Sequence, residues 1–126
     1  MNDKRITHIL VADAQSHVRS ALRLWLEQEA NFVVVGEAMD VTGLLLGLER
    51  GPVDVVLLDC DLPGLPICHL LRLLQWERPF LPIIAMSSRP EARRQALQSG
   101  ATAFLSKGAP PETVLLLLGR LLQTAT

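Results

Sequence analysis

Residues 54–59 read DVVLLD, four consecutive branched apolar residues between two aspartates. A strand that is apolar at every position has to be buried on both faces, as happens when helices cover both sides of a parallel sheet. The run therefore predicts a buried strand over Val53–Leu58. Four further short apolar runs predict strands of the same kind, at Ile6–Ala12, Phe32–Glu37, Leu81–Met86 and Ala101–Leu105.

Segments with helical spacing of apolar residues separate these strands. They are Ser16–Ala30, Val41–Arg50, Leu65–Glu77, Pro90–Ser99 and Pro110–Gln123. Strands alternating with helices in this way predict an α/β fold, a (βα)5 doubly wound parallel sheet with helices on both faces.

Cap residues support these boundaries. Ser16 is expected to cap the first helix, and Gly100 to follow the fourth helix in a left-handed conformation. Gly51-Pro52 is expected to close the second helix, and Pro110-Pro111 suits the opening turn of the fifth.

Length and composition limit the kind of protein. The chain of 126 residues fits one domain, over residues 1–126, and its formal net charge of −1 argues against direct nucleic-acid contact. Cys60 and Cys68 lack the spacing of a zinc site, which favours reduced thiols. A charged start without an apolar core behind it, and apolar runs too short for a membrane span, predict a soluble cytoplasmic protein without membrane contact.

Polar side chains stand where the predicted strands end. The first strand leads to Asp13, the third to Asp59, the fourth to Ser87 with Ser88, and the fifth to Lys107. Ligands of open parallel sheets bind beyond the carboxyl ends of the strands. We therefore expect two carboxylates, a hydroxyl and an ammonium to meet at one edge of the sheet.

Five short motifs carry a resemblance to a known family. They are ILVAD at 9–13, VVVGEA at 33–38, DVVLLD at 54–59, LPG at 62–64 and GATAFLSK at 100–107. Over nearly its whole length the chain resembles the receiver domains of two-component response regulators, especially the LuxR/NarL-type branch. The resemblance implies a flavodoxin-like sheet with strand order 2-1-3-4-5.

The resemblance also implies roles for site residues. Asp59 would be the phosphoacceptor, Lys107 would pair with the phosphoryl group, and Asp13 would help to hold Mg²⁺. Ser87 would contact the phosphoryl oxygens, and with the aromatic Phe104 it would act as a switch residue.

The chemistry of these residue types agrees with the implied roles. A carboxylate attacks phosphorus only if the charge of the transferred group is neutralised, which a divalent cation, a lysine and hydroxyl or amide donors achieve together. Mg²⁺ prefers oxygen ligands. Asp13, Asp59 and the Asp61 backbone carbonyl would supply the protein's share.

One position departs from the family pattern. Ala14 follows Asp13 where the family has a second acid that binds the metal directly. The absence of this second acid should weaken Mg²⁺ binding and slow or prevent phosphorylation. Asp61 could either replace the missing charge or repel a phosphodonor, and the sequence leaves both open.

The leucine content exceeds what one buried helical stripe requires. The fifth helix carries leucines at all of residues 115–118, and the first helix adds Leu24 and Trp25. This surplus favours a homodimer or output-domain contact through the first or fifth helix, against the alternative of a generous core.

The favoured hypothesis is a receiver that takes a phosphoryl group from a histidine kinase and switches protein interactions in transcription regulation, with a DNA-binding domain expected outside this chain, after residue 126. Such a domain is not an enzyme in the usual sense, although a receiver can catalyse its own phosphorylation and dephosphorylation. Ala14 favours a second hypothesis, a degenerate pseudo-receiver that acts by protein contact without phosphorylation.

A third hypothesis comes from another class. The run Leu57–Asp61 is similar to the nucleophile motif of haloacid-dehalogenase-like phosphatases, in which the second aspartate is the acid–base. That family places its nucleophile on the first strand and needs further acids after the lysine, and here only Glu112 follows Lys107 in this region. Phosphatase activity lost in Asp61→Asn would support this reading.

Overall fold

The structure, a computed structural model, describes residues 5–124. Five parallel strands form one sheet in the order β2-β1-β3-β4-β5. The strands are β1 Thr7–Ala12, β2 Phe32–Ala38, β3 Val55–Asp59, β4 Ile83–Ser87 and β5 Ala103–Ser106. The predicted fold class and the strand order implied by the resemblance are both confirmed.

The central strand β3 is buried along its whole length, as the run of branched residues predicts. Val55 and Leu57 belong to one core cluster, whereas Val56 and Leu58 belong to the other. Successive side chains of a strand point to opposite faces, so β3 anchors two separate cores.

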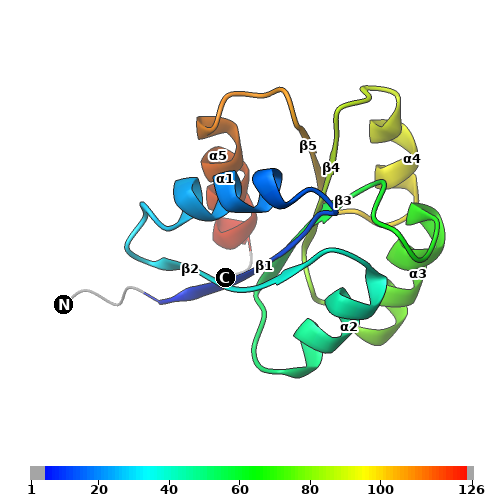
Figure 1. The fold of residues 1–126 in the computed structure, drawn as a ribbon, viewed down its shortest axis with the longest axis horizontal. Coiled ribbons are helices and arrows are strands. Elements are labelled where there is room, and N and C mark those ends of the chain that lie inside the picture. The colour runs from blue at the N-terminus through cyan, green and yellow to red at the C-terminus, as the bar shows by residue number, and fades with distance from the viewer. Residues whose placement is uncertain (1–4, 125–126) are drawn as a thin grey trace.

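Five helices cover the two faces of the sheet. They are α1 Ser16–Leu26, α2 Val41–Glu49, α3 Ile67–Glu77, α4 Ala92–Gln98 and α5 Glu112–Thr124. Helices α1 and α5 share one core cluster, and α2, α3 and α4 share the other. Figure 1 shows the two groups on opposite sides of the sheet.

Three strands begin two residues later than predicted, at Val55, Ile83 and Ala103. Pro82, which directly precedes β4, has no N–H to offer a ladder. Ala101 N donates to Ala96 O at 3.0 Å, which closes α4 rather than opening β5. The later strand ends place Asp59 and Ser87 inside the last ladder positions, so the sheet itself holds them.

Three helices also begin two residues later than predicted, at Ile67, Ala92 and Glu112. Pro66 is the extended N-cap of α3, and the carbonyls of Pro90 and Pro110 accept bonds from residues three further along the chain, so each α-helix begins beyond its proline. Within residues 5–124, no helix is both long and apolar enough to cross a bilayer.

The predicted capping role of Ser16 is wrong. Ser16 is already helical, and Gln15 is the N-cap without a side-chain hydrogen bond. The Asp13 carboxylate reaches into the loop instead, where its Oδ1 accepts from Gln15 N at 2.9 Å. Gly100 does adopt a positive φ of 118° after α4, as expected of a helix-ending glycine.

The other boundary differences lie at helix ends. Helix α1 ends at Leu26, short of the predicted Ala30, and α2 ends at Glu49 with Arg50 as its C-cap, just before the expected Gly51-Pro52. The chain after Leu26 must turn back, because Phe32 N bonds to Glu29 O at 3.1 Å at the start of β2.

Candidate functional site

Three charged side chains from separate strand ends meet at the carboxyl edge of the sheet. Lys107 Nζ lies 2.7 Å from Asp13 Oδ2 and 3.3 Å from Asp59 Oδ1. Asp13 directly follows β1, Asp59 is the last residue of β3, and Lys107 directly follows β5. We call these three residues the carboxylate–lysine cluster.

Both carboxylates of this cluster are buried. Asp13 is 0% exposed and Asp59 is 4% exposed. Asp59 Oδ1 accepts a hydrogen bond from Asp61 N at 3.0 Å. Asp13 Oδ2 is buried without an aligned hydrogen-bond donor among the described residues, so its contact with Lys107 is an ion pair rather than a well-directed hydrogen bond.

The neighbouring carboxylates stabilise the charged form of Lys107. Partial burial alone would lower the pKa of the Lys107 ammonium, but Asp13 and Asp59 outweigh that effect and raise the pKa above its ordinary value. Two carboxylates facing one ammonium leave the cluster with one uncompensated negative charge. Such a cluster attracts a further cation and holds a positive group where an incoming anion would dock.

A pocket of about 810 Å³ opens at this edge. Asp59, Asp61, Lys107 and Ser88 belong to its polar lining, and Ala14 also lines it. Helix α1, the segment between β5 and α5, and α5 supply much of the remaining wall, from His17, Val18, Ala21, Leu22, Trp25, Ala109, Pro110, Pro111 and Val114. The Asp59 carboxylate is therefore reachable from solvent despite its low exposure.

Ser87 lies beside this site at the end of β4. It is 1% exposed, and its Oγ accepts from Arg89 N at 3.0 Å, while Lys107 N donates to Ser87 O at 3.0 Å. The pocket wall is formed by the neighbouring Ser88 rather than by Ser87. Phe104, on β5, is half-buried against the core that β5 shares with α4, and its switch role stays a prediction.

Asp61 is paired with an arginine that lies outside the carboxylate–lysine cluster. Its side chain is 64% exposed, and its Oδ1 lies 2.9 Å from Arg89 Nη2. The carboxylate that could have replaced the missing acid is thus already paired with an arginine.

Cys60, next to Asp59, is buried and uncharged in character. Burial first, and then the charges of Asp59 and Asp61, raise the pKa of its thiol to about 11. A thiol with this pKa stays protonated at neutral pH and is a poor nucleophile.

The donor set suits a weakly held Mg²⁺. Asp13, Asp59 and the Asp61 backbone carbonyl would hold it, and the buried Asp13 Oδ2 without an aligned donor is an oxygen of the kind that a hard cation takes. The Ala14 side chain offers no further oxygen, and between residues 5 and 124 no three side chains of aspartate, glutamate, histidine or cysteine are grouped so that they could hold a metal ion by themselves. When bound, the cation would neutralise charge on a transferring phosphoryl group.

Two residues of α1 lie at the site although no site role was predicted for them from the sequence: Val18-Arg19 only formed part of the family resemblance, and Trp25 was expected on a dimer surface. Arg19 Nη1 donates to the Asp13 backbone carbonyl at 2.6 Å, and Trp25 lines the pocket. Residues 19, 23 and 27 follow a four-residue spacing with charges at each position, and this stripe was the available signal for Arg19.

Comparison with protein families shows what this arrangement belongs to. The model of the response regulator receiver domain matches residues 9–118. The chain belongs to the response regulator receiver family, and it is the receiver domain of a two-component response regulator. The family assignment and the position of Asp59 on the third strand remove the ground for the haloacid-dehalogenase hypothesis, which needs its nucleophile on the first strand.

Of three curated relatives, two are named as transcription regulators and one as a response regulator. The transcriptional regulatory protein ResD of Bacillus subtilis is 30% identical over 100% of this chain and 52% of its own length. The response regulator UvrY of Escherichia coli is 32% identical over 86% of this chain and 50% of its own length. The transcriptional activator ExaE of Pseudomonas putida is 34% identical over 90% and 54%. The chain spans about half the length of these relatives.

Solved structures agree with the NarL-type branch. The signal receiver domain of NarL from Mycobacterium tuberculosis superposes with a TM-score of 0.82 at 27% identity, covering 93% of this chain and 97% of that one. RcsB from Salmonella enterica serovar Typhimurium, solved on a promoter with a beryllofluoride phosphomimetic, gives a TM-score of 0.85 at 25% identity, covering 94% and 61%.

Proposed function

We propose that this receiver accepts a phosphoryl group on Asp59 from the phosphohistidine of a histidine kinase, and that the acyl phosphate changes its affinity for protein partners. The observation that carries the proposal is the Asp59 carboxylate in a solvent-open pocket, 3.3 Å from the Lys107 ammonium. The membership of the receiver family supports the same function.

The proposed step is a phosphoryl transfer between two protein side chains. An Asp59 carboxylate oxygen forms a bond to phosphorus while the phosphorus–nitrogen bond of phosphohistidine breaks, and the imidazole leaves and takes up a proton. The charge gathering on the phosphoryl oxygens would face the Lys107 ammonium, whose raised pKa keeps it charged at neutral pH. Mg²⁺ held by Asp13, Asp59 and the Asp61 carbonyl is part of the proposal.

Acetyl phosphate and beryllofluoride test this step directly, each with and without Mg²⁺. We expect intact-mass spectrometry to show the addition of one phosphoryl group, with a loss of the adduct in Asp59→Asn. Beryllofluoride with Mg²⁺ should change the fluorescence of Trp25, which lines the pocket. The variant Trp76→Phe removes the second tryptophan of the chain, so that the signal reports on the pocket alone.

Ala14 supports a second candidate, a pseudo-receiver that signals by protein contact without phosphorylation. Ala14 lines the pocket where the family pattern expects an acid, and Asp61 is paired with Arg89 instead of replacing it. No phosphoryl adduct and no beryllofluoride response in the wild type, together with both appearing in Ala14→Asp, would favour this candidate.

The switch and the partners complete the proposal. Ser87 and Phe104 would transmit the change at Asp59 towards α4 and α5, and a DNA-binding domain outside this chain would read it, as the names of the relatives suggest. The NarL-type likeness and the family support a cytoplasmic location beside a histidine kinase. The variant Phe104→Ala tests the switch. We expect it to reduce the change in partner binding that acetyl phosphate causes in the wild type, a change that should be absent in Asp59→Asn.

A homodimer through the first or fifth helix is also part of the proposal. Leu24 on α1 and Leu116 on α5 are 66% and 65% exposed, and Trp25 is 38% exposed. Light scattering of wild type and Leu116→Glu at matched concentrations tests this surface, because a charge at its centre should reduce any dimer present.

A further inference from the structure

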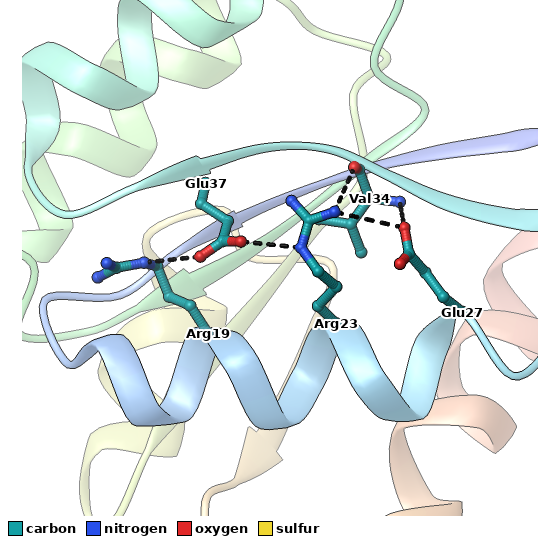
Figure 2. Close-up of polar contacts among 5 residues, drawn as sticks. All are labelled: Arg19, Arg23, Glu27, Val34 and Glu37. Carbon is teal, nitrogen blue, oxygen red and sulfur yellow. Dashed lines mark hydrogen bonds and ion pairs between the residues drawn. The ribbon is translucent and has the colours of Figure 1, made fainter.

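Four charged side chains join α1 to the edge strand β2 (Figure 2). Glu37 accepts two hydrogen bonds, one on Oε1 from Arg19 Nε at 3.0 Å and one on Oε2 from Arg23 Nε at 2.9 Å. Arg23 also lies 3.5 Å from Glu27. We call Arg19, Arg23, Glu27 and Glu37 the α1–β2 network.

Two members of this network also bond to the backbone of the edge strand. Glu27 Oε2 accepts from Val34 N at 3.1 Å, and Arg23 Nη1 donates to Val34 O at 3.4 Å. Figure 2 shows both contacts reaching the middle of β2 from α1. These two side chains therefore stabilise the sheet edge, because they satisfy backbone groups that an edge strand leaves unpaired.

Arg19 differs from the other members of the network because it also bonds to a residue of the carboxylate–lysine cluster. Its Nη1 donates to the Asp13 backbone carbonyl at 2.6 Å while its Nε is held by Glu37, and its side chain is only 15% exposed. A guanidinium is a rigid planar fork, so one end fixed on β2 fixes the position of the other end. Arg19 thus ties the residue after β1 to the neighbouring strand.

The other contacts of Asp13 show what this tie controls. Asp13 N donates to Ala38 O at 2.9 Å, and the carboxylate uses Oδ1 for Gln15 N and Oδ2 for Lys107. The Arg19 bond fixes the peptide group between Asp13 and Ala14. Gln15, whose amide donates to the Asp13 carboxylate, comes directly after Ala14 in the chain. A shift of this backbone would move the Gln15 amide, the backbone donor that together with Lys107 orients the Asp13 carboxylate.

We propose that Arg19 is a positioning residue of the phosphoryl-accepting site: anchored on Glu37, it holds the Asp13–Ala14 peptide so that the Asp13 carboxylate faces Lys107 and Asp59. This inference rests on the proposed function. In the family pattern two acids after the first strand bind the cation, whereas here Ala14 leaves Asp13 alone at the end of β1. Cation binding should therefore depend more strongly on how the Asp13 carboxylate is oriented.

Arg23 provides a matched control for Arg19. Both arginines lie on α1 and both donate Nε to Glu37, but Arg23 bonds to Val34 O where Arg19 bonds to Asp13 O. We therefore compare Arg19→Gln with Arg23→Gln in the Trp76→Phe background. A purely structural role predicts that both variants lose stability and that the site responds alike in both.

The first readout is the apparent affinity for Mg²⁺ with beryllofluoride, followed by Trp25 fluorescence. We expect Arg19→Gln to weaken this affinity about tenfold, the size expected for one lost charge-assisted hydrogen bond, and Arg23→Gln to change it less than about twofold. Urea unfolding of both variants measures their folding stability independently. Equal weakening in both variants, or none in Arg19→Gln, would overturn the proposal.

The second readout does not need phosphorylation. Hydrogen exchange of the Gln15 amide reports its bond to the Asp13 carboxylate, and we expect exchange about tenfold faster in Arg19→Gln and nearly unchanged in Arg23→Gln. If the wild type takes neither phosphoryl group nor beryllofluoride, the proposed function fails, while this exchange difference still decides whether Arg19 positions Asp13.

If Arg19→Gln does not fold, Arg19→Lys takes its place. Lysine keeps the positive charge beside Glu37 but cannot bridge two acceptors with a rigid fork. Faster Gln15 exchange than in Arg23→Lys supports the positioning role, and identical exchange in the two lysine variants overturns it.

Discussion

Two groups of charged side chains meet at Asp13, one through its carboxylate and the other through its carbonyl. The carboxylate–lysine cluster is buried, carries two acids against one base, and contains a carboxylate oxygen without an aligned donor in the described part of the chain. The α1–β2 network is partly exposed, balances two arginines against two glutamates, and bonds to backbone groups of β2.

The difference separates a reactive site from a structural one. A charge set that is balanced and hydrogen-bonded has little to gain from another ligand, whereas a buried set with a charge left over can gain much. The two groups are nevertheless connected, because Arg19 belongs to one and holds the backbone of the other.

The largest difference between the two groups is expected when the proposed acceptor is removed. Asp59→Asn should abolish the phosphoryl adduct and the beryllofluoride response altogether, while folding stability stays the same or rises, since a buried carboxylate beside Asp13 is removed. Intact-mass spectrometry and urea unfolding measure the two effects. An adduct that survives in Asp59→Asn would show that another group is the acceptor.

Removal of the compensating cation should come next in size. Lys107→Met leaves two buried carboxylates without their ammonium and should destabilise the fold by about 3 kcal/mol. Urea unfolding tests this, and the double variant Asp13→Asn with Lys107→Met should recover part of the loss. A single variant as stable as the wild type would show that the ion pairs contribute nothing to folding.

Addition of the missing acid should sharpen the contrast between the groups. Ala14→Asp places a further carboxylate on the pocket wall and should strengthen Mg²⁺ binding by about tenfold or more. Titration with Mg²⁺, followed by Trp25 fluorescence, measures the change. Unaltered affinity would mean that position 14 is not part of the metal site.

The smallest effect is expected from the balanced network. Partial burial would raise the pKa of Glu37, but hydrogen bonds and charge from Arg23 and Arg19 outweigh it and hold the pKa below 4.5. Its contribution to stability is therefore present above pH 4.5 and is lost as the pH falls through the lowered pKa.

Glu37→Gln should remove that part of the acid dependence and cost less than about 1 kcal/mol at neutral pH, as exposed ion pairs usually do. Unfolding of wild type and variant at several pH values below and above 4.5 provides the test. Parallel stability curves for the two proteins over this range would contradict it.

The predicted boundaries failed beside prolines and at the first turn of α1. The late starts of α3, α4 and α5 follow prolines, whose effect on the first turn could have been read from the sequence. The loss of Ser16 as a cap could not, because the helix begins one residue earlier than expected: Val18 N and Arg19 N both donate to the Gln15 carbonyl, which makes Gln15 the N-cap.

The sequence by itself determined the layered sheet and the strand ends that carry Asp13, Asp59 and Lys107, because apolar periodicity is a local property that burial on two faces imposes on each strand. Only the tertiary structure decided the pairing among charges: that Lys107 lies closer to Asp13 than to Asp59, that Asp61 turns to Arg89, and that Arg19 holds the Asp13 carbonyl. Such pairings join segments far apart in the chain, and their geometry depends on how the packed helices and strands present each side chain, which no local pattern records.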